Sequence, residues 1–557
     1  MASASRRRPR TLQLLLAALV VGAVCVSIHT QQRQWTWAWT RETTTPLRTL
    51  RRTPQALIQR IADDWRQHLQ SHLRSDGTFD RELSLYPEEI FTVDWTNEVT
   101  DRDLRHSAAL HAACMTYKDS VIPWSVGLDV TANDSARPLD APDDALVVSV
   151  LAQCPDVDIF LPAGIRGHGY CEDAVAYAKC AYSTYSRHAL LLFSLLANAA
   201  SYADLQSRIL PAWVFSTTFF DVTRQRNVTY HDLCPRTPLI VFNHYWDGVP
   251  DAPDWPATKR LYLMPNIEMF ELQATHYERA DIVLCKTAIC ARYVSLWYAQ
   301  QSPERRNATV LFTRHTSTHV ALAAGADTGA EAGTIAVKNW TEPSFIHVAG
   351  SSSQKGTARV LRCWLSRPDL PAIDVFVTQH NYNRLFSDEF DQELQRGGHD
   401  NVRLHVGQLD AATFGRHIAA ASVFLCPSYM EGYGHYINQA RATGGLVVTT
   451  DAAPMNELVT PASGVLVHAA PSHFAQQLLG GFSDQRKALR NVSGLVARVR
   501  SVDLCERVDD VLQLLSASDR RRRAERARQQ FCFDTRYFAS AMTTLRAMAR
   551  HKLQQGR

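Results

Sequence analysis

The residues whose types and spacing could do chemistry are concentrated in one stretch, residues 422–459. A carboxylate, Glu431, is followed by two glycines, Gly432 and Gly434, and then by the amide of Gln439. Glycine permits backbone angles with φ > 0 and the close approach of a ligand. A helix that begins at such a turn presents N–H groups and a partial positive charge at its N-terminus. The stretch therefore predicts a site that can hold a diphosphate without a metal ion.

Secondary-structure elements must position these residues, and the order of elements around them is easy to read. Residues 422–425 form a short apolar run typical of a buried strand, and residues 446–450 form a second. A helix is expected to begin at the glycine turn and to end at Thr443, Gly444 and Gly445. Strand, glycine loop and helix in this order are typical of nucleotide-binding α/β folds.

This layout resembles the donor-sugar signature of family 4 glycosyltransferases, which is Glu-Gly-Phe-Gly with a second Glu eight residues after the first. Here the signature reads Glu431, Gly432, Tyr433 and Gly434, with Gln439 at the second position. The resemblance implies that Glu431 contacts the donor sugar and that Gln439 bonds the nucleotide ribose. The amide is a departure from the family, because it carries no charge. On this basis Gln439→Glu is expected to be tolerated or to raise activity.

Two further segments resemble donor-binding parts of the same family. Gly350, Ser351 and Lys355 follow a predicted strand at residues 345–349 and resemble the family's Gly-Arg…Lys-Gly loop. The resemblance implies that Lys355 neutralises the donor diphosphate, with Ser351 standing where an arginine is usual. Glu457 stands where the family commonly has a Glu that closes the donor pocket; the alternative for it is a carboxylate at a helix N-terminus.

In the N-terminal half, predicted strands end on polar residues. Residues 238–242 are followed by His244, and residues 260–264 are followed by Asn266 and Glu268. Open α/β sheets bind ligands at the carboxyl ends of their strands. The resemblance implies a histidine near the reacting carbon of the donor, and Asn266, Glu268 and His244 are the candidates for that work. We expect them to form the catalytic site together with Glu431.

A glycine loop, residues 164–169, precedes a predicted helix and carries Arg166 and His168. We expect these side chains to contact the acceptor or a phosphate, with an ordinary strand-to-helix turn as the alternative. Residues 145–151 are predicted to be the first strand of this half.

The strand series predicts an α/β fold, and the resemblance implies two Rossmann-like domains that face a cleft, the GT-B architecture, behind an N-terminal membrane anchor. The expected segments are a cytosolic tail (1–10), a signal-anchor transmembrane helix (11–30), a stem and N-terminal elaboration (31–135), an acceptor-side domain (136–335), a donor-side domain (336–510) and C-terminal helices (511–557), the last packing back on the first domain.

Composition and targeting signals bound the class of protein. The 557 residues are 46% hydrophobic and 20% charged, with a formal net charge of +4, which favours a globular protein and gives no reason to expect nucleic acid. Arginines precede the apolar run at residues 12–28, which favours an uncleaved anchor over a signal peptide. Sequons at Asn133, Asn227, Asn307, Asn339 and Asn491 favour a single-pass type II protein whose catalytic domain lies in the lumen of the Golgi or endoplasmic reticulum.

Cysteine spacing gives little support for a metal site. The chain has 12 cysteines and no CxxC motif, so we do not expect a zinc site. The resemblance implies that helix N-termini and basic side chains stabilise the leaving diphosphate, so we expect no other metal or cofactor. Cys171 with Cys180, and Cys505 with Cys532, are candidate disulfides.

The leading hypothesis is a glycosyltransferase that moves a sugar from a nucleotide-sugar donor to a glycan, glycoprotein or glycolipid acceptor, with retention implied by the resemblance. The alternative is a catalytically inactive protein of the same fold that binds carbohydrate or acts as a scaffold. Gln439 and Ser351 favour the alternative, because each replaces a charged donor contact.

Overall fold

The structure is a computed structural model, and the positions it describes are residues 53–71, 83–127, 137–140, 143–167, 169–179, 207–269, 271–302, 308–325, 338–397, 399–472, 479, 489–490, 492 and 494–555. The chain divides into two compact units, Met1–Ile61 and Ala62–Arg557. The described part of the first unit is the beginning of helix α3 (Pro54–Ser71). All contacts reported below lie within the second unit.

The first half of the second unit is organised around a seven-stranded sheet, which is parallel except for one edge strand. The order across the sheet is β1 (Ile122–Pro123), β3 (Arg208–Leu210), β2 (Asp158–Phe160), β6 (Leu239–Phe242), β7 (Leu261–Met264), β8 (Ile282–Cys285) and β9 (Thr309–Phe312). Strand β1 pairs antiparallel with β3. The central strands are buried along their whole length, as expected for short apolar runs with helices over both faces. We call residues 83–325 the first lobe.

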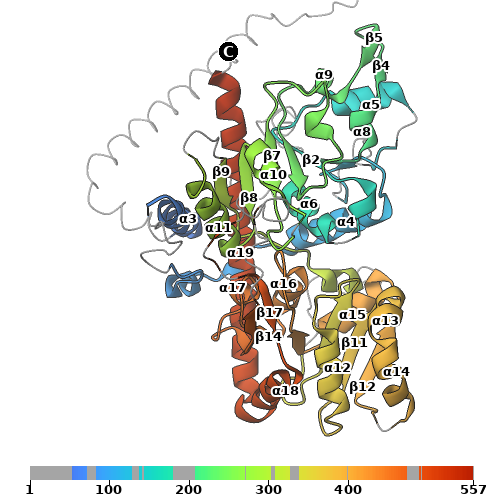
Figure 1. The fold of residues 1–557 in the computed structure, drawn as a ribbon, viewed down its shortest axis with the longest axis vertical. Helices are drawn as coiled ribbons and strands as arrows, with labels where there is room; N and C mark the ends of the chain where they lie inside the picture. Colours follow the sequence, from blue (N-terminus) through green and yellow to red (C-terminus); the bar gives the residue numbers. More distant parts are fainter. Residues whose placement is uncertain are drawn as a thin grey trace, which may run out of the picture. The chain divides into compact units, whose positions relative to one another are not determined.

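Helices and a hairpin flank the first sheet (Figure 1). They are α4 (Asp101–Thr116), α5 (Asp144–Leu151), α6 (Tyr170–Lys179), α8 (Trp213–Ser216), α9 (Tyr230–Leu233), α10 (Ala274–Arg279) and α11 (Ala288–Ala299), with the hairpin β4 (Phe219–Asp221) and β5 (Arg226–Val228). Short 3₁₀ helices occupy Glu88–Thr92, Trp95–Asn97, Ala163–Ile165, Val249–Asp251 and Val320–Gly325.

The strand predicted at residues 145–151 is wrong, because this segment is helix α5. Asp143 caps the helix, and its carboxylate accepts bonds from the N–H groups of Ala145 and Leu146. Val147 and Leu151, four residues apart, are buried on one face. An apolar run of this length does not distinguish a strand from a buried helix, and the cap decided the outcome.

The second half is organised around a six-stranded sheet in which every pairing is parallel. The order is β12 (Val402–Val406), β11 (Ile373–Val377), β10 (Phe345–Gly350), β13 (Val423–Cys426), β14 (Leu446–Thr450) and β15 (Gly464–Val467). Its helices are α12 (Thr357–Leu365), α13 (Gln379–Leu385), α14 (Ser387–Gln395), α15 (Ala411–Ala420), α16 (His435–Ala442), α17 (Met455–Leu458) and α18 (Ser501–Asp509), with a small sheet of β16 (Ala470–Ser472) and β17 (Val496–Arg498). We call residues 338–516 the second lobe.

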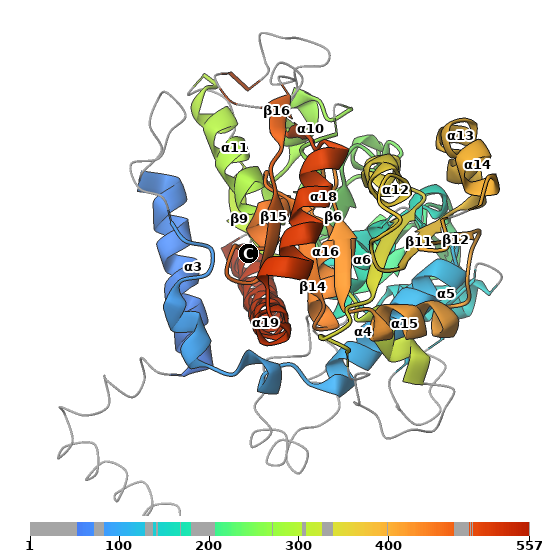
Figure 2. The same ribbon diagram turned by 90° about the horizontal axis from the view of Figure 1, so that it is seen from below.

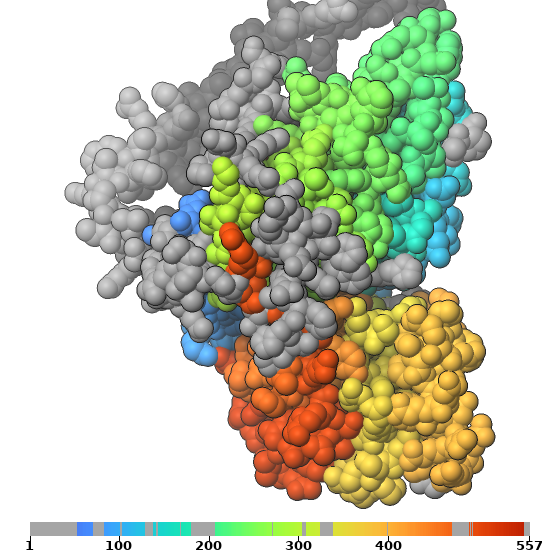
Figure 3. Space-filling view, viewed as in Figure 1, coloured from blue at the N-terminus to red at the C-terminus, as the bar shows by residue number. Residues whose placement is uncertain are grey.

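The α/β fold with parallel sheets that the sequence predicted is therefore confirmed. In Figure 3 the surface of the first lobe is coloured blue to green, and that of the second lobe yellow to orange-red. The strand at residues 446–450 and the helix that begins at the glycine turn also lie where the sequence placed them.

One long helix, α19 (Ala517–Gln555), packs against both lobes (Figures 1 and 2). Ala524 belongs to the core of the second lobe, whereas Phe538, Met542 and Leu545 belong to the core of the first. The helix runs from Ala517 to Gln555 without a break, where the sequence predicted several C-terminal helices. A π-helical turn, Asp510–Leu514, precedes it.

A buried network joins α19 to three other segments. The two carboxylate oxygens of Asp534 accept bonds from Arg314 (2.5 Å), Arg441 (2.8 Å) and the hydroxyl of Tyr86 (2.7 Å). Both arginines and Asp534 are at most 3% exposed. Because buried charges are costly unless paired, Asp534 provides a shared counter-charge for the two buried guanidinium groups.

Three of the four disulfides among the described residues join segments that are distant in sequence, and the fourth, Cys285–Cys290, spans five residues. The pairs are Cys114–Cys171, Cys154–Cys234, Cys285–Cys290 and Cys363–Cys505, while Cys426 and Cys532 are buried free thiols. The predicted pair Cys505–Cys532 is wrong, and Cys171 bonds Cys114 instead of the predicted Cys180, which lies outside the described residues. Spacing along the chain does not encode which sulfurs meet.

Within the described residues, none of the helices combines the length and apolar character needed to cross a membrane. The predicted anchor, residues 11–30, lies outside those residues.

Asp534→Asn should lower the free energy of unfolding by about 3–5 kcal/mol, because it leaves two buried guanidinium groups without a counter-charge. Glu525→Gln is the matched control, since its partner Arg521 is exposed, and it should change stability by less than about 1 kcal/mol. Chemical unfolding of the full chain measures both. Equal effects of the two variants would contradict the assignment of a buried network.

Candidate active site

The glycine turn of the second lobe lies directly against the end of strand β7 in the first. A side-chain carbon added at Gly432 would be 2.3 Å from Oδ1 of Asn266 and 2.7 Å from Oε1 of Glu268, so a larger residue would displace these two side chains. Gly434 has φ +102 and precedes the first residue of α16. The structure therefore brings together Asn266, Glu268 and the N-terminus of α16, three features that the sequence placed in different halves of the chain.

Glu431 and Lys355 form an ion pair at this turn. Nζ of Lys355 lies 2.6 Å from Oε1 of Glu431, and the hydroxyl of Ser428 donates to the same oxygen at 2.6 Å. The ammonium also lies 3.8 Å from the ring centroid of Tyr436. The two side chains are 14% and 11% exposed, so both retain some access to a ligand. Two residues that the sequence assigned to the nucleotide-sugar site are thus adjacent, and their charges neutralise one another.

The loop that carries Lys355 begins and ends at glycines in the left-handed region, Gly350 and Gly356. Gly350 ends β10 with φ +55, and Ser351 next to it is exposed. Gly356 has φ +74 and touches the main chain of Pro427, since an added carbon would be 2.2 Å from that carbonyl oxygen. This contact holds the loop against the strand that leads into the glycine turn.

The polar residues after β6 and β7 leave buried atoms without partners. The Asn266 N–H donates to Oδ1 of Asn243 at 2.5 Å. Oδ1 of Asn266, Oε2 of Glu268 and Nδ1 of His244 have no hydrogen-bond partner among the residues that the structure describes. Burial raises the pKa of Glu268 to about 7. Unpartnered buried acceptors of this kind are typical of sites that hold a ligand or move a proton.

Gln439, which the resemblance placed at the ribose, makes a hydrogen bond within the protein. Its amide nitrogen donates to Oε1 of Glu172, a buried carboxylate of α6, at 2.7 Å. Glu457 is likewise bonded across the lobes, because its two oxygens accept the N–H groups of Ala288 and Ile289, both at 2.7 Å, at the N-terminus of α11. Burial raises the pKa of Glu457 to about 7, although these two bonds act in the opposite direction.

Tyr433 is a buried residue of the turn, and its hydroxyl accepts a bond from the side chain of Asn438 at 2.8 Å. Arg166 is 1% exposed and donates to the main-chain oxygens of Leu161, Tyr117 and Ser120. We expected Arg166 to contact the acceptor. Its guanidinium instead bonds three main-chain oxygens, and so the side chain holds the loop in place. His168 lies outside the described residues.

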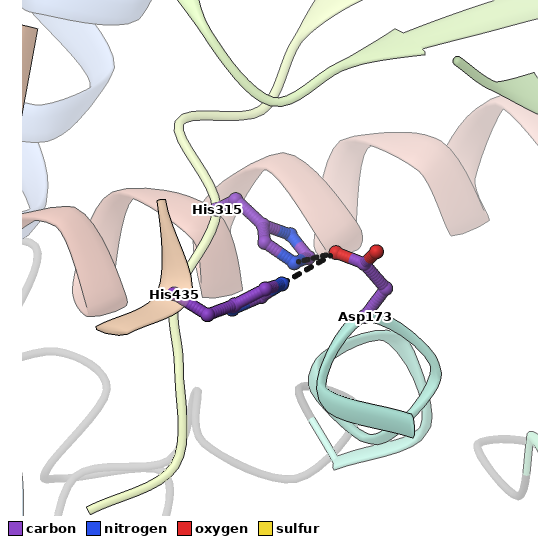
Figure 4. A group of neighbouring side chains, drawn as sticks. All are labelled: Asp173, His315 and His435. Carbon is purple, nitrogen blue, oxygen red and sulfur yellow. Dashed lines mark hydrogen bonds and ion pairs between the residues drawn. The ribbon is translucent and has the colours of Figure 1, made fainter. Parts of the chain in front are cut away.

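A cluster that the sequence did not single out as a site lies behind the glycine turn (Figure 4). Oδ1 of Asp173 lies 2.9 Å from Nε2 of His315 and 3.0 Å from Nε2 of His435. Lys286 contacts both oxygens of Asp173, at 2.9 and 3.0 Å. Although burial favours the protonated acid, Lys286 and the histidines hold the pKa of Asp173 well below its usual value. We call Asp173, Lys286, His315 and His435 the Asp173 cluster.

The sequence carried only part of the signal for this cluster. Lys286 follows β8, and a rule that polar residues at strand ends bind ligands would have found it. His315 reaches the cluster because Arg314 and His315 both adopt left-handed backbone angles, φ 64 and 70. These angles could not be predicted from the two residue types, since arginine and histidine rarely adopt them.

Asp173, His315 and His435 offer a carboxylate and two imidazoles, a donor set that could hold a divalent cation. Burial lowers the pKa of His315 to about 4, so its ring is neutral at pH 7. The ammonium of Lys286, however, already contacts both oxygens of Asp173 and compensates its charge. Lys286 thus supplies the positive charge that a metal ion would bring.

The ionisation of Glu268 should be visible in the pH dependence of stability. Its pKa is raised from 4.5 to about 7 in the folded chain, so the folded protein holds this proton more tightly than the unfolded chain does. The contribution to stability is therefore complete below pH 4.5 and is lost as the pH rises to 7, by an amount on the order of 3 kcal/mol. Glu268→Gln should remove this part of the slope between pH 5 and 7. Parallel pH profiles for wild type and variant, measured by chemical unfolding, would show that Glu268 does not hold this proton.

Comparisons with known proteins bear on the second lobe. Residues 384–484 match the family described as Glycosyl transferases group 1, and this span includes Glu431, the glycine turn, Gln439 and Glu457. No curated protein sequence matches the chain significantly.

Solved structures similar to this chain include several glycosyltransferases. The alpha,alpha-trehalose 6-phosphate synthase from Burkholderia multivorans is 11% identical, with a TM-score of 0.41 over 58% of this chain and 73% of that one. The pneumococcal O-GlcNAc transferase GtfA, in complex with UDP and GlcNAc, is 11% identical, with a TM-score of 0.39 over 57% of each chain. HepE from Anabaena, in complex with UDP and glucose, is 13% identical, with a TM-score of 0.39 over 72% of this chain and all of that one. The match of residues 384–484, which carry the glycine turn, to the glycosyl transferases group 1 family agrees with the resemblance to glycosyltransferases drawn from the sequence.

Proposed function

We propose that this protein transfers a sugar from a nucleotide-sugar donor to a glycan, glycoprotein or glycolipid acceptor, with retention of anomeric configuration and without a metal ion. In this proposal the two lobes are the Rossmann-like domains of a GT-B enzyme. The observation that carries it is the meeting of the glycine turn at α16 with the Glu431–Lys355 pair and with Asn266 and Glu268.

The donor diphosphate would be held by the N-terminus of α16 and by Lys355. A helix N-terminus and an ammonium both favour negative charge, and they would stabilise the charge that develops on the leaving diphosphate. A phosphate that competes for Lys355 would break its ion pair with Glu431. Glu431 would then be free to accept hydrogen bonds from hydroxyl groups of the donor sugar, the role that the resemblance implies for it.

Glu268 is suited to accept the proton that the acceptor hydroxyl must lose. Its pKa of about 7 lets it exist in both protonation states near neutral pH, which is the condition for efficient general acid–base catalysis. Its oxygen Oε1 lies at the glycine turn, and its other oxygen has no partner among the described residues. Asn266, beside it, and His244, at the end of the neighbouring strand, would orient the sugars.

A second candidate function is supported by one observation. Lys355, Gln439 and Glu457, three residues expected to touch the donor, are all bonded within the protein, to Glu431, Glu172 and the N-terminus of α11. A protein that kept the fold as a carbohydrate-binding or scaffolding module would show such internally satisfied side chains. The two functions differ in whether nucleotide sugars bind and turn over.

Lys355→Ala should weaken binding of a nucleoside diphosphate by about 1.5–3 kcal/mol, because it removes a charge-assisted contact to phosphate. Glu431→Ala should abolish sugar transfer while leaving nucleotide binding intact or tighter, since it releases Lys355 from its ion pair. Lys118→Ala, at an exposed lysine, is the control. Titration calorimetry and hydrolysis assays with UDP-, GDP-, ADP- and CDP-linked sugars measure the effects. Full activity of Glu431→Ala would rule out the proposed mechanism, and a protein that binds carbohydrate but no nucleotide would support the scaffold.

We also propose the lumenal, type II placement that the arginines and sequons predict. Asn227 and Asn339 are exposed and therefore accessible to modification. Endoglycosidase treatment of the protein from eukaryotic cells should lower its apparent mass, and Asn227→Gln should remove one step of that shift. A mass unchanged by the treatment, in a protein that carbonate extracts from membranes, would contradict the placement.

A further inference from the structure

Helices α6 and α16, one from each lobe, are joined by two neighbouring carboxylates. Glu172 accepts a bond from Gln439 at 2.7 Å, and Asp173 lies 3.0 Å from His435. Residues four apart on a helix lie on the same face, so His435 and Gln439 present one side of α16 to α6. The first two turns of α16 are thereby fixed to a helix that lies more than 250 residues earlier in the chain.

Glu172 is built to receive a hydrogen-bond donor. The N–H and the hydroxyl of Thr318 donate to its two oxygens, at 2.8 and 2.5 Å, and Nε2 of His111 lies 3.6 Å from one of them. Although burial favours the protonated acid, His111, His435 and the bonds from Thr318 hold the pKa of Glu172 below its usual value. A carboxylate at position 439 would meet this charge at hydrogen-bond distance, whereas an amide donates to it.

We propose that Glu172 is a positioning residue for sugar transfer. By binding Gln439 it holds α16 in the register that places the main chain of Gly432 against Asn266 and Glu268. The inference rests on the proposed function. It also reverses the expectation drawn from the sequence, because Gln439 is committed to Glu172, and Gln439→Glu should impair the protein.

The experiment is a charge-swap cycle in the full-length chain. The variants are Gln439→Glu, Glu172→Gln and the double variant that carries both, which returns one amide and one carboxylate to the pair. Glu389→Gln is the matched control, because Glu389 pairs with Arg362 on the surface of the second lobe. The rate of nucleotide-sugar hydrolysis is measured for kcat and KM with the UDP-, GDP-, ADP- and CDP-linked sugars, and the melting temperature is measured alongside.

Gln439→Glu should lower kcat by about 10- to 100-fold, the range for a reacting group displaced by about 1 Å, with a smaller change in KM. The double variant should recover most of the lost kcat, and the control should match wild type. A purely structural pair would lower the melting temperature and leave kcat of the folded protein unchanged, which would overturn the inference alone, as would a double variant no better than Gln439→Glu. A wild-type protein that turns over none of these donors would overturn the proposed function and the inference together.

Discussion

Buried carboxylates that must be neutralised across the two lobes are the constraint on which the rest of the site depends. Glu172 and Asp173 are buried and Glu457 is partly buried, and each finds a hydrogen-bond donor or positive charge in the other lobe. Asp534 does the same for two arginines beneath them. Removing one partner from such a pair leaves an uncompensated charge in a medium of low polarity, which is far more costly than losing an exposed pair. The lobes are thus held in register by charge compensation at specific positions.

This constraint fixes the position of the glycine turn. Helix α16 is bonded to α6 at His435 and Gln439, one helical turn apart, and Gly432 lies just before this helix, against Asn266 and Glu268. The left-handed backbone at Arg314 and His315, which costs about 1 kcal/mol or more at each non-glycine residue, is held by the same contacts. His315 reaches Asp173 and Arg314 reaches Asp534, so the two strained residues each serve one of the buried carboxylates.

The same arrangement implies that a ligand must exchange contacts that the protein already makes. Lys355 is paired with Glu431, and a phosphate would have to displace that carboxylate. The pair compensates both charges. In the proposed function, it would link diphosphate binding to the release of the side chain that would meet the sugar. In contrast, Gln439 and Glu457 are bonded to buried partners and are part of the connection between the lobes.

The sequence by itself determined the local elements and the donor-side motif. Short apolar runs such as residues 446–450 became buried parallel strands, because they have no polar face to expose. The glycine pattern determined where α16 begins, since φ +102 at Gly434 is open to few other residues. The motifs also identified Glu431 and Lys355 as site residues. These residues pair at 2.6 Å because their loops follow two neighbouring strands, β13 and β10. Residues 145–151 show the limit of such patterns, because an apolar run fits a strand as well as the capped helix that forms.

Only the tertiary structure decided which distant groups meet. The Asp173 cluster takes its members from α6, from the ends of β8 and β9 and from α16, and no spacing along the chain connects them. For the same reason, the sequence did not predict that Cys171 pairs with Cys114 or that Gln439 bonds Glu172. A side chain's identity states what it can donate or accept, but its partner depends on how helices and strands pack. The role of Gln439 therefore followed from the buried carboxylate opposite it, because that charge requires a donor.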